Sequence, residues 1–232
     1  MKKAKLILMR HGESLYNLEG RFTGWSDVDL SEKGITEARD AGSLLQKHQI
    51  YPDICFTSWL KRSIHTANLA LESLGWEHID SVRSWQLNER HYGAWQGQKK
   101  DQVKAEVGEE HFVAIRRGYE MAPPPLAVSD PRSAHHEKKY AALDSAAIPA
   151  TESLQTTQKR VVAYYQAVIL KALQSNKDVL VAAHGNSLRA LVMYLEAMHP
   201  QDVAMLEIPT GEIIVYTFDA QMQIIKKEVL LG

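Results

Sequence analysis

The chain has 232 residues, of which 45% are hydrophobic and 24% charged, and its formal net charge is −1 at pH 7. This is the balance of an ordinary globular protein, and it gives no electrostatic reason to expect nucleic acid or a membrane surface as a partner. The single cysteine, Cys55, excludes an internal disulfide and a structural zinc site built on cysteines, and its apolar neighbours indicate a buried strand thiol.

The N-terminal region carries no recognisable targeting segment. The apolar run that follows the basic start extends only from Leu6 to Met9, which is too short for a secretory signal. No stretch approaches the ~20 apolar residues that a membrane span requires. A cytoplasmic protein is therefore expected.

Strands and helices alternate along the chain. Apolar runs predict strands at 5–9, 53–57, 81–87, 178–183, 212–218 and 223–230. Helical periodicity is predicted at 31–48, 59–74, 100–107, 109–118, 151–175 and after Ser187 to about Met198, with Ser31, Ser58 and Thr151 as N-caps. The pattern predicts an α/β fold, a three-layer α/β/α sandwich whose mostly parallel central sheet carries an antiparallel edge strand.

One segment departs from this alternation. Residues 119–150 include a run of three prolines and lack strong periodicity. A loop of this length inside a compact domain is usually functional or mobile. We expect a single domain over residues 1–232 with an insertion at about 119–150.

Two predicted buried strands end in the same way, with a histidine followed by a glycine: His11-Gly12 and His184-Gly185. Ligands of open α/β sheets bind at the carboxyl ends of the strands, so both imidazoles are expected at one edge of the sheet. Arg10 precedes the first histidine, and Arg62 is expected in a first helical turn, where an anion is favoured. A neutral imidazole among guanidinium groups suits metal-free phosphoryl transfer.

Metal and nucleotide motifs are absent from the sequence. There is no H-E-x-x-H or H-x-H spacing, and the adjacent pair His135-His136 falls in the polar insertion, which indicates an exposed loop. No glycine-rich dinucleotide or ATP motif follows a strand.

Other polar residues permit two interpretations each. Glu89 lies beside Arg90 in a dense polar and aromatic loop, where it is either a general acid/base or an ion-pair partner of that arginine. Arg116 and Arg117 either stabilise the C-terminus of a helix or bind an anion. Lys100, taken alone, is as ambiguous as these two arginines and has no assigned role from its position.

Several segments together carry a resemblance to a known family. They are Arg10-His11-Gly12-Glu13 and residues 21–34, 58–66, 87–93, 116–118, 123–125 and 182–190. From end to end of the chain they resemble the bisphosphoglycerate-dependent phosphoglycerate mutases of the histidine phosphatase superfamily. The resemblance implies a glycolytic and gluconeogenic enzyme that interconverts 3-phosphoglycerate and 2-phosphoglycerate, with 2,3-bisphosphoglycerate as primer and no metal.

The resemblance also implies roles for single residues. His11 would be the phosphorylated nucleophile, Glu89 the proton donor and acceptor, and Arg10, Arg62 and His184 would stabilise the transferring group. Residues implied to line the phosphate and substrate pocket are Ser14, Asn17, Thr23, Gly24, Gly185 and Asn186. Those implied to hold the substrate carboxylate and second phosphate are Arg90, Tyr92, Lys100, Arg116 and Arg117. The resemblance also implies a homodimer. The implied substrate is a small molecule, a phosphoglycerate.

One departure from the family and two rival functions bear on this prediction. Family members often carry a C-terminal tail, whereas this chain stops at Leu230-Leu231-Gly232, so we expect a shift from mutase toward phosphatase activity. A phosphomonoesterase would share the catalytic core, although Arg116-Arg117 and the triple proline favour a mutase. A non-catalytic phospholigand binder would need neither a nucleophile nor an acid/base.

Overall fold

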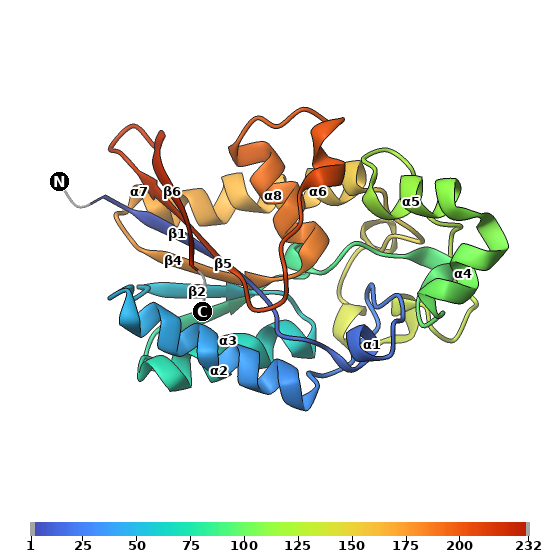
Figure 1. The fold of residues 1–232 in the computed structure, drawn as a ribbon, viewed down its shortest axis with the longest axis horizontal. Coiled ribbons are helices and arrows are strands. Elements are labelled where there is room, and N and C mark those ends of the chain that lie inside the picture. The colour runs from blue at the N-terminus through green and yellow to red at the C-terminus, as the bar shows by residue number, and fades with distance from the viewer. Residues whose placement is uncertain (1–2, 231–232) are drawn as a thin grey trace.

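The computed structural model describes residues 3–230, which form a six-stranded sheet in the order β3-β2-β4-β1-β5-β6 (Figure 1). Its strands are β1 (Lys5–Arg10), β2 (Ile54–Thr57), β3 (Asp80–Arg83), β4 (Val179–Ala183), β5 (Ile213–Phe218) and β6 (Ile224–Leu230). The strands β1 to β4 are parallel, β5 runs antiparallel to β1, and the edge strand β6 pairs antiparallel with β5. The predicted mostly parallel sheet with an antiparallel edge is confirmed.

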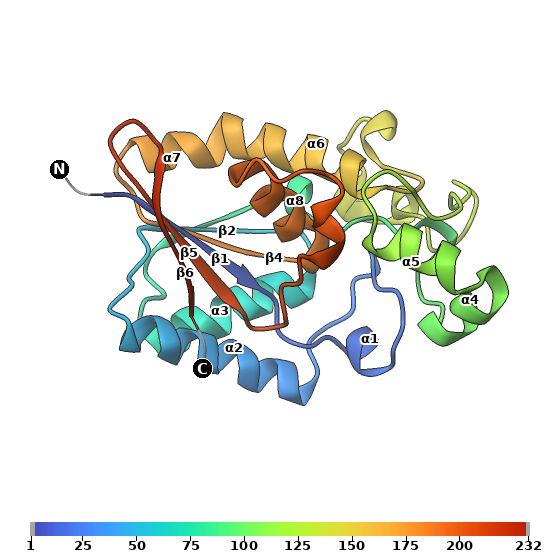
Figure 2. The same ribbon diagram turned by 45° about the horizontal axis from the view of Figure 1, so that its top comes forward.

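Helices cover both faces of the sheet and complete the predicted three layers (Figure 2). One face carries α2 (Glu32–Lys47) and α3 (Lys61–Leu74). The other carries α6 (Leu154–Tyr164), a π-helix (Tyr165–Ile169), α7 (Leu170–Gln174) and α8 (Gly185–Leu195).

The sheet is apolar on both sides because both faces are covered. Successive strand residues point to opposite faces. In β1, Leu6 and Leu8 therefore pack with the α6 and α8 side, whereas Ile7 and Met9 pack with α2 and α3. Cys55 lies in the second of these cores, and burial raises the pKa of its thiol to about 12, which confirms a buried strand thiol.

The remaining helices gather beyond the carboxyl ends of the parallel strands (Figure 1). They are α1 (Leu15–Leu18), α4 (Lys100–Val107) and α5 (Glu109–Arg117), with short 3-10 helices at 85–87, 93–95, 134–136, 138–140, 145–147 and 202–205. The helix α1 was not predicted, because four residues are too few to show a helical period.

Helix starts follow local capping chemistry. Ser31 caps α2 as predicted, since its Oγ accepts from Gly34 N at 3.1 Å. The predicted cap Ser58 is wrong, because α3 begins at Lys61 and its N-cap has no side-chain hydrogen bond. The Ser58 hydroxyl instead lies 2.8 Å from Nε2 of His184.

Two further boundaries also differ from prediction. The helix predicted over 151–175 begins after Ser153, whereas the hydroxyl of the predicted cap Thr151 donates to Pro123 O at 2.8 Å. The strand predicted over 81–87 ends at Arg83, and residues 85–87 turn into a 3-10 helix.

Residues 119–150 pack through scattered anchors, which explains their lack of periodicity. Ala134, Tyr140 and Ile148 are buried together with Trp25. The Tyr140 ring stacks on Trp25 with centroids 5.1 Å apart, and its hydroxyl accepts from Asn88 Nδ2 at 2.9 Å. The segment thereby contacts two loops that lie close to the predicted site.

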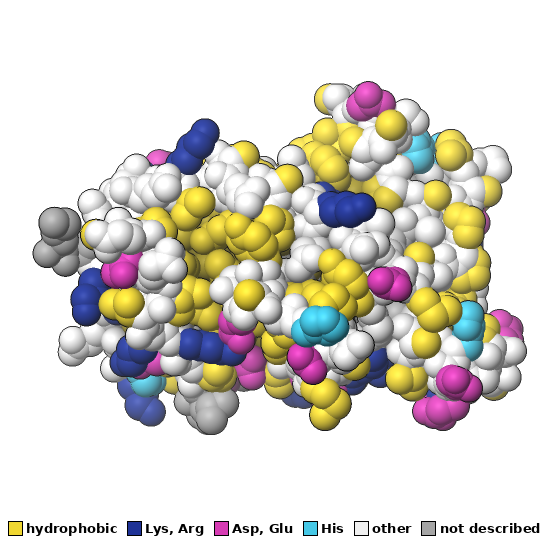
Figure 3. All heavy atoms as spheres, turned by 90° about the horizontal axis from the view of Figure 1, so that it is seen from above, with side chains coloured by type: hydrophobic (Ala, Val, Ile, Leu, Met, Phe, Trp, Pro, Cys, Tyr) yellow, Lys and Arg dark blue, Asp and Glu magenta, His cyan; other side chains and the backbone are white. Residues whose placement is uncertain are grey.

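The surface seen from above has an apolar area between charged groups (Figure 3). The exposed large apolar side chains of the molecule include Tyr194, Met205 and Ile225. Within residues 3–230, no helix is both long and apolar enough to cross a membrane. The prediction about the C-terminal end depends on Leu231 and Gly232, which lie outside the described residues.

Candidate active site

A cavity of about 270 Å³ lies beyond the carboxyl ends of β1 and β4. Most of the predicted site residues line it: Arg10, His11, Asn17, Thr23, Gly24, Arg62, Glu89, Tyr92, Lys100, Arg116, Arg117, Gly185 and Asn186. Three predicted residues, Ser14, Arg90 and His184, are not among the lining side chains. Segments from most of the length of the chain thus converge on one space.

The two histidines lie side by side because their strands are neighbours. In the parallel pair β1 and β4, Arg10 is in register with Ala183, so each histidine follows at the same level. The rings of His11 and His184 are 4.9 Å apart between centroids. The glycine after His11 serves a different contact: it lets the chain pass close to the first turn of α2, since a Cβ on Gly12 would lie 2.2 Å from Gly34 O. The predicted shared edge is confirmed.

The protonation of His11 follows from its contacts. Its Nδ1 lies 2.6 Å from Gly12 O, and because a carbonyl oxygen only accepts, Nδ1 carries the hydrogen. Burial, followed by the positive charges of Arg62 and Arg10, lowers the pKa of His11 well below its ordinary value. The ring is therefore neutral at neutral pH, with its lone pair on Nε2. Such an imidazole is a competent nucleophile.

Arg62 combines charge with a structural task. It is fully buried in the first turn of α3, and its two Nη groups donate to Gly24 O at 2.7 Å and Ser26 O at 2.9 Å. Burial lowers its pKa to about 10, so the side chain stays cationic at neutral pH. Among the described residues, the buried Nε atoms of Arg62 and Arg10 have no hydrogen-bond partner. These donors remain free for an anion.

A second group of cations lies farther from the strand ends. Lys100 is the first residue of α4, and Arg116 and Arg117 close α5. All three line the same cavity. Burial, then the charges of Arg116 and Arg10, lower the pKa of Lys100. Cations packed this closely repel one another and favour an anion between them.

Glu89 is held at the positive end of a helix. Its Oε1 accepts from Arg90 N at 2.7 Å and from Asn186 N, in the first turn of α8, at 3.1 Å. Within residues 3–230, the Arg90 guanidinium makes no ion pair. It donates to Ile115 O at 2.8 Å and lies 4.6 Å from the Tyr92 ring centroid. Of the two interpretations of Glu89, the geometry therefore favours the acid/base.

The three predicted residues outside the lining contact residues that belong to it. Ser14 caps α1, and its Oγ accepts from Asn17 N at 3.2 Å. The Arg90 guanidinium lies over the Tyr92 ring. His184 lies against His11, and burial lowers its pKa well below the ordinary value.

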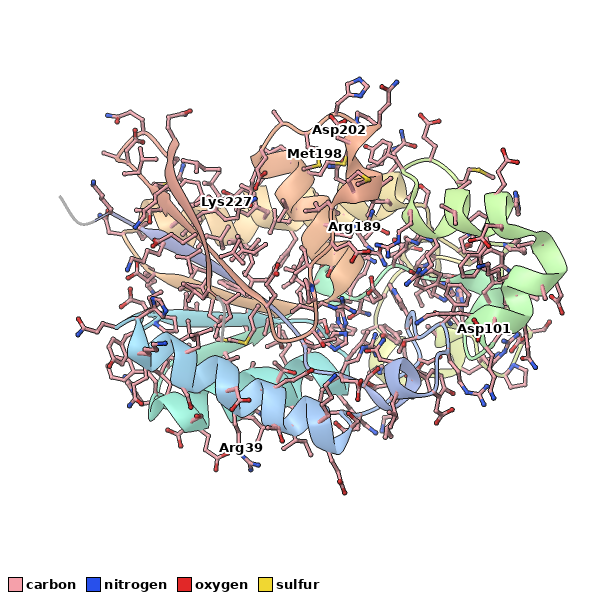
Figure 4. The ribbon with its side chains drawn as sticks, viewed as in Figure 1. Arg39, Asp101, Arg189, Met198, Asp202 and Lys227 are labelled. Carbon is pink, nitrogen blue, oxygen red and sulfur yellow. The ribbon has the colours of Figure 1, made fainter. Side chains whose placement is uncertain are left out.

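Sequence reasoning missed several lining residues, namely Arg21, Phe22, Arg189, Glu207, Ile208 and Pro209. Arg189 belongs to α8, and its side chain extends to the end of α5 (Figure 4). It donates to Asn186 Oδ1 at 2.8 Å and to Arg117 O at 3.0 Å. Its position three residues after Asn186 on a helix is the signal that could have identified it. Glu207 pairs with Arg117 from a distant segment, and no local pattern announces that contact.

The described residues offer no evident metal centre. Among them, no group of three or more His, Cys, Asp or Glu side chains is arranged to hold an ion. His135 and His136 lie in a short 3-10 helix of the insertion, and His136 is exposed, in keeping with the predicted loop.

The arrangement of fold and site is that of a known superfamily. The family model of the histidine phosphatase superfamily (branch 1) matches residues 6–135 and 127–229. The chain belongs to this superfamily and is one of its enzymes.

Two curated relatives are much more similar. The 2,3-bisphosphoglycerate-dependent phosphoglycerate mutase of Lachnoclostridium phytofermentans is 48% identical over 226 residues, which cover 97% of this chain and 91% of the relative. The protein of the same name from Thermobifida fusca is 51% identical over 211 residues, covering 91% and 85%.

Solved structures confirm the fold at lower identity. A putative alpha-ribazole-5'-P phosphatase from Escherichia coli str. K-12 superposes with a TM-score of 0.72 at 21% identity, covering 99% of this chain and 96% of the other. A mycobacterial glucosyl-3-phosphoglycerate phosphatase gives 0.73 at 22% identity, covering 99% and 98%. At this identity the likeness concerns the fold alone.

Proposed function

We propose that this enzyme interconverts 3-phosphoglycerate and 2-phosphoglycerate through a phosphohistidine at His11. The observation that carries the proposal is the neutral His11, whose Nε2 lone pair is free in a cavity that also holds Glu89 and two groups of cations. The names of the two curated relatives, at about half identity over most of the chain, support the same reaction.

The cavity suits 2,3-bisphosphoglycerate as the primer. That molecule presents three anionic groups, two phosphates and a carboxylate. Arg10 and Arg62 beside His11 match one phosphate, and Lys100, Arg116 and Arg117 match the other two groups. Buried guanidinium Nε atoms without a partner among the described residues are the donors expected of an anion site.

The reaction then follows from the residues in place. Phosphorylated His11 transfers its phosphoryl group to one hydroxyl of a monophosphoglycerate while Glu89 removes the proton of that hydroxyl. The bisphosphorylated molecule reorients, and Nε2 of His11 accepts the other phosphoryl group as Glu89 returns the proton. Arg10, Arg62 and His184 stabilise the charge on the transferring group. The product is the positional isomer, and His11 is phosphorylated again.

The proposal includes a setting and an assembly. The enzyme would act in glycolysis and gluconeogenesis. It would be located in the cytoplasm and form a homodimer. Sedimentation of the purified protein would test the assembly, since a monomer at all concentrations would contradict the homodimer.

The test of the reaction is conversion of 3-phosphoglycerate to 2-phosphoglycerate in excess EDTA, with and without 2,3-bisphosphoglycerate, while free phosphate is followed. We expect isomerisation that survives EDTA and increases with the primer. Release of phosphate without isomer would overturn the proposal in favour of a phosphomonoesterase. Loss of isomerisation in EDTA would contradict a reaction carried by His11 and arginines alone.

A further inference from the structure

Glu89 lies in an irregular loop, residues 84–92, that no strand ladder fixes. Side chains hold the backbone of this loop instead, and the one that makes the most bonds to it is Arg160 of α6, whose side chain is only 9% exposed. Its Nη1 donates to Gln86 O at 2.7 Å and Asn88 O at 2.9 Å, and its Nη2 donates to Glu89 O at 2.9 Å. Three carbonyls of the loop thus converge on one guanidinium.

Glu152 completes this contact from the other side. Its two carboxylate oxygens accept from Nε and Nη2 of Arg160, each at 2.7 Å. A guanidinium has five N–H donors, and all five of Arg160 are used. Glu152 also brackets His91, because its Oε2 accepts from His91 N at 2.8 Å and its own N donates to His91 O at 2.9 Å.

The pair therefore fixes the backbone on both sides of Glu89. Trp25 adds a bond from its Nε1 to Glu89 O at 2.7 Å, so that this carbonyl accepts two hydrogen bonds. With the backbone fixed, the Glu89 carboxylate reaches the amides of Arg90 and Asn186. A shift of about 1 Å in such a group is enough to impair a proton transfer.

We propose that Arg160, paired with Glu152, is the positioning residue for Glu89. All five of its N–H groups go to Glu152 and to carbonyls of the Glu89 loop, so its hydrogen bonds act on the proton transfer through the position of Glu89. Its positive charge also contributes to the lowered pKa of His184, and lysine at this position keeps that charge. The inference rests on the proposed role of Glu89 as the acid/base. Lysine cannot replace the arginine, since it has three donors on a point charge and no planar fork.

The test separates proton transfer from phosphoryl transfer by the choice of donor. When His11 is phosphorylated, an N–P bond forms and a P–O bond breaks. The alkoxide that leaves from 2,3-bisphosphoglycerate needs the Glu89 proton, whereas the phenolate that leaves from p-nitrophenyl phosphate does not. The rate of phosphohistidine formation in a single turnover is measured with each donor in the wild type and in Arg160→Lys. The donor concentrations are high enough for a slow phosphorylation to be measured.

We expect Arg160→Lys to slow phosphorylation by 2,3-bisphosphoglycerate on the order of 10²-fold, and phosphorylation by p-nitrophenyl phosphate by less than about threefold. Glu89→Gln should show the same selectivity, and the double variant should lose little more than either alone. Arg132→Lys is the matched control. Arg132 also donates to two loop carbonyls, Ala94 O and Gln96 O, but not to the loop of Glu89, and both rates should be unchanged.

Each contrary outcome has one meaning. Equal losses with both donors in Arg160→Lys would make Arg160 a structural residue only and would overturn the inference. Unchanged rates with both donors would overturn it as well. Donor selectivity in Glu89→Gln but not in Arg160→Lys would remove the inference alone and leave the proposed function standing. Absence of selectivity in Glu89→Gln would instead remove the role of Glu89, and the inference with it.

Discussion

The two sides of the cavity are built by different means. On one side, Arg10 ends β1, and His11 and His184 directly follow β1 and β4, so that backbone ladders between strands set their positions. On the other side, Glu89 sits in a loop whose place depends on hydrogen bonds from the side chains of Trp25 and Arg160. The proposed nucleophile is thus positioned by the sheet, and the proposed acid/base is positioned by side-chain hydrogen bonds.

This difference determines how far a substitution acts. A change at a strand end alters the chemistry of one side chain and leaves the backbone in place, because many ladder bonds share the constraint. A change beneath the Glu89 loop removes several of the few bonds that hold it. Substitutions at His11 and at Glu89 therefore test the two sides separately.

His11→Ala should abolish mutase turnover, with a loss of at least ~10⁴-fold, because no other group in the cavity offers the same nucleophile. The fold should persist, since β1 is held by its neighbours and a neutral ring is removed. Turnover and thermal unfolding are measured on the same preparation. Appreciable isomerisation by the variant would refute the phosphohistidine route, whereas an unfolded variant would refute the independence of the strand side.

Glu89→Gln should lower kcat by about 10²–10⁴-fold, the usual contribution of a general acid/base. Glutamine keeps an oxygen that can accept from Arg90 N and Asn186 N, so KM should change little. Steady-state rates for 3-phosphoglycerate give both values. A variant with the wild-type kcat would show that the loop side carries no proton transfer.

The same contrast explains what the sequence could predict. The sheet and the strand-end histidines follow from local patterns, since an apolar run fixes a strand and the residue after it. The placement of Glu89 depends on Glu152 and Arg160, which lie some sixty to seventy residues further along the chain. No periodicity relates such residues, so only the resemblance to a family could choose between the two interpretations of Glu89, general acid/base or ion-pair partner of Arg90.

Capping shows the same limit on a smaller scale. Ser31 was identified correctly because its acceptor role is local, to an amide three residues away. Ser58 was not, because its Oγ accepts from Leu60 N at 3.1 Å, only two residues away, and the helix begins later, at Lys61. The hydroxyl also lies 2.8 Å from Nε2 of His184, at a strand end far along the chain. A serine before an apolar run thus marks a helix start only where its oxygen accepts from an amide of the first helical turn.

The buried histidines make stability depend on pH on both sides of the cavity. Burial lowers the pKa of His91, on the loop side, to about 4, and lowers those of His11 and His184 as well. Below the unfolded value of about 6.5 the unfolded chain binds protons that the folded chain does not, so stability is lost as the pH falls from about 6.5 toward 4. Above about pH 6.5 these histidines no longer change the free energy of unfolding with pH.

Urea unfolding at about pH 5 and pH 7.5 measures the effect. His91 alone should account for about 2 kcal/mol of the decrease in the free energy of unfolding between the two pH values. His91→Asn keeps an acceptor for Gly93 N and should reduce the decrease by that amount. An undiminished decrease in the variant would show that His91 is protonated in the folded protein.

The smallest effect is expected at the rim, at Glu207. Among the described residues, the carboxylates that line the cavity are Glu89 and Glu207, and the second pairs with Arg117. Its side chain is 61% exposed, so the pair is worth at most about 1 kcal/mol. An anionic substrate that binds Arg117 must displace this carboxylate. Glu207→Gln should therefore lower KM for 3-phosphoglycerate by about two- to fivefold and leave kcat unchanged.

Salt distinguishes this competition from a positioning role. Screening weakens exposed charge pairs, so the difference in KM between wild type and Glu207→Gln should shrink in about 0.5 M salt. Glu228→Gln removes a comparable surface partner, that of Lys226 on β6, and should leave KM unchanged. A higher KM in Glu207→Gln would mean that the carboxylate orients Arg117 for the substrate. In that case the rim, like the loop of Glu89, would depend on a side-chain contact for its geometry.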